Sequence, residues 1–228
     1  MKQACIVSYA RTPIAKAYRG AFNITPMPSL AAPVFQTVLA RAGIQGEDVE
    51  EVIMGCGRPE GTQGKNVALL RAGLPHSVAA ATVSRHCGSG LQAIANAAQR
   101  IMVDGAPVVL AAGGESISLV QNDHTNEFYG KDPWLLEHYP QAYISMLETA
   151  EVVAQRYGIS RADQDAYALS SQQRTAQAQR DGLFDSEIVA ISTIKQVVDK
   201  SQYECREVSA CLDQDECNRP TTTSDQLQ

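Results

Sequence analysis

The most informative segment of the sequence reads Thr82-Val83-Ser84-Arg85-His86-Cys87-Gly88-Ser89-Gly90-Leu91-Gln92-Ala93-Ile94. It predicts the end of a short apolar strand, a turn, and then an alanine-rich helix over residues 88–103. Cys87 therefore stands where a helix begins, and the backbone N–H groups and helix dipole at that end favour a thiolate. Gly88 and Gly90 leave room for a substrate carbonyl near the sulfur, and the same N–H groups can form part of an oxyanion hole.

Two interpretations of Cys87 remain open on these residues alone. A free cysteine is commonly a small buried hydrophobic residue, and a lone cysteine is a weak signal of catalysis. The position of Cys87 and its flanking glycines favour a nucleophile.

Strands and helices alternate on both sides of this segment. Apolar runs bounded by turn residues predict strands over residues 5–9, 48–54, 80–83 and 108–112. Apolar residues at helical spacing predict helices over residues 30–42, 66–72 and 88–103. We expect the last of these helices to be buried almost all round, because alanines cover the faces beside its apolar stripe. That stripe consists of Leu91, Ile94, Ala98, Ile101 and Met102. The regular succession indicates an α/β layer structure with at least some parallel strands.

The second half of the chain reads differently. Residues 116–143 mix polar and aromatic residues without a period, and helices are predicted over residues 145–156 and 160–180. Ser160 is expected to cap the second of these helices, with Asp163 in its first turn. Residues 201–228 are polar and end without a closing element, so we expect the chain to be truncated.

Composition and charge exclude several classes of protein. The chain has 228 residues, of which 44% are hydrophobic and 19% charged, as is typical of a globular domain. The apolar run at residues 108–112 is far shorter than the roughly 18 to 20 residues of a membrane span. The net charge of −6 comes without a basic cluster, so neither nucleic acid nor a membrane is an expected partner. The N-terminus shows no signal-peptide pattern, and six cysteines are too few for a disulfide scaffold, so we expect a reduced, cytoplasmic protein.

Residues 84–93 resemble the active-site segment of thiolases, the acetyl-CoA C-acyltransferases. Further blocks are similar to that family and follow in its order, at residues 10–13, 52–55, 111–118, 157–172, 184–189 and 215–220. The resemblance implies an α/β thiolase fold, in which two similar halves stack into a layered αβαβα core. We expect this chain to hold the N-terminal half, with the nucleophile in a core over residues 1–115 and a mostly helical loop domain with the truncated end over residues 116–228.

The resemblance also implies a reaction. In that family, the cysteine matching Cys87 takes an acyl group from a 3-ketoacyl-CoA and releases acetyl-CoA. The acyl group then passes to CoA in thiolysis, or to an acetyl-CoA carbanion in the Claisen direction. The Cys87 N–H would serve one oxyanion hole. CoA and acyl-CoA are substrates, so neither an organic cofactor nor a metal is implied, and a homodimer or homotetramer is the expected assembly.

Three further residues match substrate-binding positions of the family. Met146 matches a methionine of the acyl pocket, although core packing is an alternative for it. Arg219 matches an arginine near the CoA nucleotide, and a solvated surface arginine is the alternative. Ser145 stands where some members have a histidine that contacts pantetheine.

The chain departs from the thiolase pattern in its acid/base residues. The family's Gly-His-Pro, Asn-Glu-Ala and Cys-x-Gly motifs do not occur in these 228 residues. General acid/base catalysis typically contributes 10²–10⁴-fold, so we expect the isolated chain to be close to inactive. The alternative function is therefore a catalytically incomplete thiolase fragment that needs a C-terminal partner. A ketoacyl synthase, which shares the fold, is disfavoured by the match at residues 157–171.

The other cysteines suggest no metal site. Cys205, Cys211 and Cys217 are spaced six apart, whereas zinc sites favour closer pairs. Cys56, flanked by glycines, is interpreted as a small buried residue at a strand end.

Overall fold

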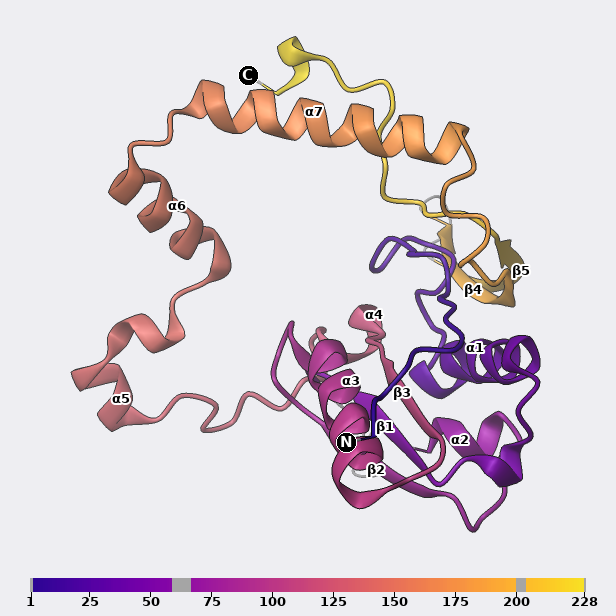
Figure 1. Ribbon diagram of the computed structural model, residues 1–228. Helices are drawn as coiled ribbons and strands as arrows, with labels where there is room; N and C mark the ends of the chain where they lie inside the picture. The colour runs from indigo at the N-terminus through magenta and orange to yellow at the C-terminus, as the bar shows by residue number, and fades with distance from the viewer. Residues whose placement is uncertain (1, 59–66, 200–203, 228) are drawn as a thin grey trace. The chain divides into compact units, whose positions relative to one another are not determined.

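The computed structural model describes residues 2–58, 67–199 and 204–227 (Figure 1). The chain forms two compact units, the first of Met1–Asp123 with Asp185–Cys217 and the second of His124–Phe184 with Asn218–Gln228. The boundary predicted between residues 115 and 116 differs from this division, because the chain returns to the first unit after residue 184.

A parallel three-stranded sheet with the order β2-β1-β3 forms the centre of the first unit. Its strands are β1 (Glu51–Gly55), β2 (Ala79–Val83) and β3 (Val109–Gly113), which confirms three of the predicted strands and the α/β class. Gly55 pairs with Val83 on one side and with Gly113 on the other, so all three strands end at one edge of the sheet.

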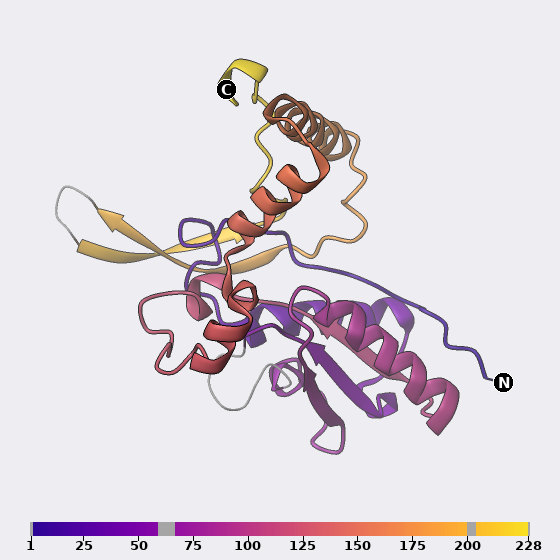
Figure 2. The same cartoon turned by 90° about the vertical axis from the view of Figure 1, so that its left-hand side faces the viewer.

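The strand predicted over residues 5–9 is wrong, because these residues join no sheet in the described chain. A strand needs a hydrogen-bonding partner as well as an apolar pattern, and no described backbone hydrogen bond joins residues 5–9 to the outer edge of β2 or β3. The segment is held instead by contacts such as that of Arg41, whose guanidinium donates to the Tyr9 carbonyl at 3.0 Å. Figure 2 shows it as an extended trace.

Helices cover both faces of this sheet (Figure 1). On one face lie α1 (Met27–Ala42), which ends at Gly43 in the left-handed conformation, and the short α2 (Ala68–Arg71). Successive side chains of β1 point to opposite faces of the sheet. Val52 and Met54 pack in the core cluster with α1, whereas Ile53 packs against α3. The helix predicted over residues 66–72 therefore forms at α2, although residue 66 lies outside the described residues.

The other face carries α3 (Ser89–Gln99), which continues as a π-helical turn over Arg100–Asp104. The prediction that this helix is buried almost all round is wrong. Its alanines Ala93 and Ala97 face the sheet and are buried, whereas Leu91 is 73% exposed and Val103 is 78% exposed. Small side chains let the helix approach the strands closely, which leaves Leu91 on the opposite face.

A hairpin that the sequence analysis missed completes the first unit. It pairs β4 (Ile191–Asp199) with β5 (Glu204–Leu212) in antiparallel register (Figure 2). Ile191 and Leu212 pair with each other at the base of the hairpin and are both buried. Short 3-10 turns elsewhere in the chain lie at Gly46–Asp48, Pro140–Tyr143 and Ser224–Gln226.

Arg11 holds the returning segment in the first unit. Its Nε donates to the Glu187 carboxylate at 2.6 Å, and its two terminal nitrogens bind the Asp215 carboxylate at 2.7 and 3.0 Å. Burial alone would raise the pKa of Asp215, but the hydrogen bonds from Arg11 and from the Ile14 N–H outweigh it and hold that pKa below its ordinary value. This charge-assisted network joins residues that lie about 200 positions apart in the sequence.

This network predicts acid-sensitive stability. Because the pKa of Asp215 is lowered by folding, its contribution is complete above the ordinary carboxyl range and is lost as the pH falls through the folded-state pKa. We expect Arg11→Met to lower the free energy of unfolding by about 2 kcal/mol at pH 7, and by much less at pH 3. Urea unfolding at both pH values measures this. Arg161→Met, which removes the more exposed pair with Asp165, serves as the control and should cost under about 0.5 kcal/mol.

The second unit is helical. It contains α5 (Pro133–His138), α6 (Met146–Tyr157) and α7 (Arg161–Arg180), while the short α4 (Ile117–Val120) belongs to the first unit. The predicted cap of α7 is confirmed, since Ser160 and Asp163 form a reciprocal capping box. No helix in the described parts of the chain is long and apolar enough to cross a bilayer.

Candidate active site

Cys87 lies in a tight turn between β2 and α3. The Gly88 N–H donates to the Arg85 carbonyl at 3.0 Å, and the Ser89 N–H donates to the His86 carbonyl at 3.1 Å. His86 has a φ of +49°, a left-handed conformation that costs a residue with a side chain about 1–3 kcal/mol. Cys87 directly precedes Gly88, the N-cap of α3, as the sequence predicted. It is exposed, so it does not pack as a buried hydrophobic residue.

Ser89 closes this turn with its side chain. The hydroxyl accepts the Arg85 N–H at 2.8 Å and donates to the His86 carbonyl at 2.6 Å. The residue is only 4% exposed. Sequence analysis did not single it out, although a serine at the start of a helix is a common signal for a bond to nearby backbone.

Glycines bring the turn onto the edge of the sheet where the strands end. A Cβ added at Gly55 would lie 2.4 Å from the Ser89 carbonyl oxygen, and one at Gly113 would lie 3.0 Å from the Gly90 Cα. The first turn of α3 therefore rests directly on the backbone ends of β1 and β3. Sites in parallel α/β sheets commonly lie beyond this edge.

Glu115 links the loops that follow β3 and β1. One of its carboxylate oxygens accepts the Gly57 N–H at 2.8 Å and the Arg58 N–H at 3.0 Å, and the other lies 3.8 Å from the Cys56 sulfur. Cys56 is 2% exposed, which confirms its interpretation as a small buried residue. Glu115 was not predicted as a site residue, since only the three-dimensional structure brings its carboxylate to these amides.

The three predicted substrate-binding residues lie in the second unit, whereas Cys87 lies in the first. Ser145 is the N-cap of α6: its hydroxyl accepts the Glu148 N–H at 3.1 Å, and the Glu148 carboxylate accepts the Ser145 N–H at 2.7 Å. The hydrogen bond from that backbone N–H lowers the pKa of Glu148, and the Ser145 hydroxyl lowers it further by a smaller amount. Met146 is 74% exposed, which excludes the core-packing alternative in this structure. Arg219 is exposed as well, and its backbone N–H donates to the Gln172 side chain at 2.7 Å.

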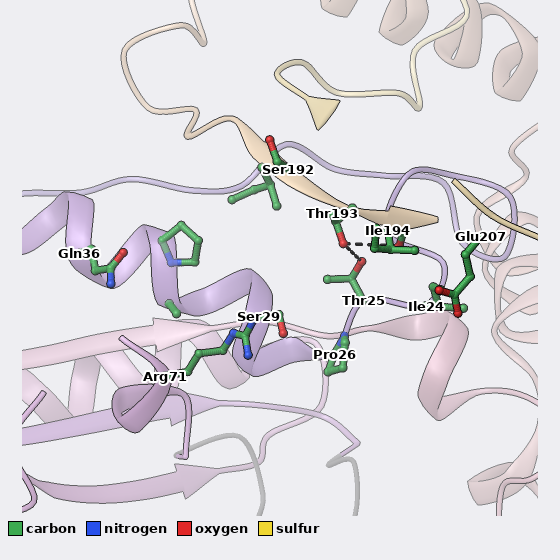
Figure 3. A pocket seen from close by; sticks show the side chains of 13 residues that line it. Ile24, Thr25, Pro26, Ser29, Gln36, Arg71, Ser192, Thr193, Ile194 and Glu207 are labelled. Carbon is green, nitrogen blue, oxygen red and sulfur yellow. Dashed lines mark hydrogen bonds between the residues drawn. The ribbon is translucent and has the colours of Figure 1, made fainter. Parts of the chain in front are cut away.

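A hollow of about 730 Å³ lies elsewhere in the first unit, between α1 and the hairpin (Figure 3). The hydroxyls of Thr25 and Thr193 meet in it at 2.7 Å, and Arg71 and Glu207 also line it. None of the predicted site residues lines this hollow, and we do not assign the predicted chemistry to it.

Comparisons with known proteins agree with the predicted family. The profile of the family "Thiolase, N-terminal domain" matches residues 4–228. A 3-ketoacyl-CoA thiolase of Bacillus subtilis is 41% identical over 232 aligned positions, which cover 100% of this chain and 58% of that protein. An acetyl-CoA acetyltransferase of Chromobacterium violaceum is 39% identical over 202 residues, covering 83% of this chain and 51% of that protein.

A solved structure shows the same fold. The crystal structure of the Bacillus anthracis acetyl-CoA acetyltransferase matches with a TM-score of 0.79 at 31% identity, covering 99% of this chain and 57% of that one. The chain thus spans little more than half the length of these three relatives.

Proposed function

We propose an acyltransferase function from one premise, which is that this chain belongs to the thiolase family, whose N-terminal domain matches residues 4–228. The thiolase fold predicted from the sequence is confirmed by the solved relative. The observation that carries the proposal is the exposed Cys87 in a constrained turn at the edge where the parallel strands end.

Cys87 is proposed to act as the nucleophile that accepts the acyl group. Its thiolate attacks the 3-keto carbon of a 3-ketoacyl-CoA, and the bond between carbons 2 and 3 then breaks. The electron pair of that bond leaves on carbon 2, which takes up a proton and departs as acetyl-CoA. The acyl thioester on Cys87 is next attacked by the thiol of CoA in thiolysis, or by the carbanion of acetyl-CoA in the Claisen direction. In either case the Cys87 thiolate is the leaving group.

Backbone N–H groups at the start of α3 are proposed to stabilise the oxyanion formed in these steps, with the Cys87 N–H as one donor. Such preorganised donors act at the developing charge and are typically worth 10²–10³-fold each. The constrained turn supports this assignment, because its two backbone hydrogen bonds hold the peptide groups around Cys87 in one arrangement.

Ser145, Met146 and Arg219 are proposed to contact the CoA substrate. Met146 would meet the acyl chain, Ser145 the pantetheine, and Arg219 the nucleotide phosphates. The exposure of the Met146 and Arg219 side chains supports the proposal, since a ligand can reach both. Arginine presents several donors that match phosphate geometry.

The test is acylation of Cys87 by acetoacetyl-CoA at alkaline pH, where hydroxide can deprotonate the thiol without a protein base. Intact mass and peptide mapping should find one acetyl group per chain, located on Cys87. An unmodified Cys87 that still reacts with iodoacetamide would contradict acylation of the isolated chain and favour the second candidate function below.

A second candidate function is a thiolase half that is catalytically incomplete and needs a C-terminal partner. The exposed apolar face of α3, which includes Leu91 and Ile94, supports this candidate and also the proposed homodimer or homotetramer. Exposed apolar patches of this kind commonly mark protein contacts. The absence of a cofactor or metal and a cytoplasmic location stay predictions.

This face predicts self-association of the isolated chain. We expect Leu91→Lys combined with Ile94→Lys to weaken association at least tenfold, because each apolar side chain buried in a contact contributes roughly 1.5–3 kcal/mol. Sedimentation velocity over a dilution series measures the effect. Leu183→Ser, at an exposed leucine of the second unit, is the matched control and should leave association unchanged. A monodisperse monomer before any substitution would contradict the prediction.

A further inference from the structure

Ser89 is a buried polar residue whose hydroxyl makes its described hydrogen bonds to the turn that carries Cys87. It accepts the Arg85 N–H at 2.8 Å and donates to the His86 carbonyl at 2.6 Å. These peptide groups lie immediately before Cys87 in the chain, whereas Ser89 belongs to the first turn of α3. The hydroxyl therefore ties the backbone on the N-terminal side of Cys87 to the helix on its C-terminal side.

His86, whose carbonyl accepts one of these two hydrogen bonds, has a strained backbone. His86 is held at a φ of +49°, which costs about 1–3 kcal/mol for a residue with a side chain. Its backbone angles set the direction in which Cys87 leaves the turn. Removing the Ser89 hydroxyl would leave the Arg85 N–H without that acceptor, and the turn could relax by releasing His86 from the left-handed region.

Ser89 is itself packed closely against the end of β1. Gly55 at the end of β1 packs so closely that an added Cβ would lie 2.4 Å from the Ser89 carbonyl oxygen. With only 4% of its surface exposed, Ser89 is also enclosed by its surroundings. The fixed edge of the sheet thus anchors the hydroxyl, and the hydroxyl anchors the turn.

We propose that Ser89 is a positioning residue for Cys87, which fixes the sulfur and the neighbouring backbone N–H relative to each other. The inference rests on the proposed function of Cys87 as an acyl acceptor. A carbonyl bound at the sulfur meets the backbone donors only when both are held in one geometry, and misplacement by about 1 Å can cost a hundredfold in rate. Access of a small reagent to the exposed thiol needs no such geometry.

The experiment compares two reagents on the chain. Iodoacetamide alkylates any accessible thiol, whereas p-nitrophenyl acetate transfers an acetyl group to the sulfur through an oxyanion and releases p-nitrophenolate. Rates at Cys87 are followed by peptide mass spectrometry, with the exposed Cys217 as the reference in the same molecule. We expect Ser89→Ala to slow acetyl transfer by about tenfold to a hundredfold, while alkylation changes less than twofold.

Two further variants test whether the effect belongs to this hydroxyl. Ser116 is equally buried and donates to the Thr25 carbonyl at 2.8 Å, so Ser116→Ala is the matched control and should change neither rate. Ser89→Thr keeps the hydroxyl and should restore most of the acetyl transfer. If Ser89→Ala does not fold, Ser89→Val replaces it, since valine has the shape of threonine without the hydroxyl and adds no second thiol beside Cys87.

Equal slowing of both reactions, or of neither, in the variant without the hydroxyl would overturn the inference. A third reagent separates this result from the proposed function. If the unaltered chain accepts acetyl from p-nitrophenyl acetate but not from acetoacetyl-CoA, the proposed thiolase step fails, while a selective effect of Ser89→Ala on the ester still supports the positioning role.

Discussion

Replacing Cys87 with alanine will abolish acyl transfer to the chain from acetoacetyl-CoA. The expected change is from one acetyl group per chain to none, because no other group in the proposed mechanism can form the thioester. The exposed position of Cys87 means that its removal should leave the fold intact, within about 0.5 kcal/mol of the free energy of unfolding. Intact mass spectrometry after incubation at alkaline pH measures the loss.

Cys217→Ser is the control for this variant. Cys217 is also exposed and also belongs to the first unit, but it lies outside the turn between β2 and α3. The Cys217→Ser variant should still take up one acetyl group per chain. An acetyl group that persists after Cys87→Ala, mapped to another cysteine, would show that the reagent labels exposed thiols without a site.

Substituting alanine for Gly55 will destabilise the fold and misplace the site together. The added Cβ would lie 2.4 Å from the Ser89 carbonyl oxygen and 2.7 Å from the Gly90 nitrogen, and both are backbone atoms that cannot rotate away. Overpacking of this kind typically costs 1–3 kcal/mol, and we expect about 3 kcal/mol here since the contact is with the first turn of a helix. Thermal and urea unfolding measure the stability, and acetyl transfer from p-nitrophenyl acetate measures the site.

Gly90→Ala provides the control, because an added Cβ at Gly90 meets nothing within 4 Å. Alanine in a helix is favoured over glycine, so this variant should be more stable by up to about 1 kcal/mol. If both alanine variants were equally stable, α3 would not rest on the end of β1 as the structure shows.

Much of the local structure could be predicted from neighbouring residues. The capping box of Ser160 and Asp163, the end of α1 at Gly43 and the extent of α6 each depend on side chains within one or two helical turns. The turn that presents Cys87 likewise depends on consecutive residues. The blocks that resemble thiolases follow one another along the chain in the order of that family. These features depend on short-range geometry, which the order of residues specifies directly.

Long-range contacts determined the strand pairing, the burial of helix faces and the packing between distant segments. The apolar pattern of residues 5–9 is typical of a strand, yet whether it forms one depends on a partner, and in the described chain the segment pairs with neither edge strand of the sheet. The period of α3 shows an apolar stripe, but only packing on the sheet determines that the alanines are buried and Leu91 is exposed. The close approach at Gly55 and the link from Arg11 to Asp215 join elements whose spacing no local pattern specifies. Packing between distant segments therefore placed the sheet edge on which the turn rests, while local sequence placed Cys87 and the Ser89 hydroxyl that bonds to its turn.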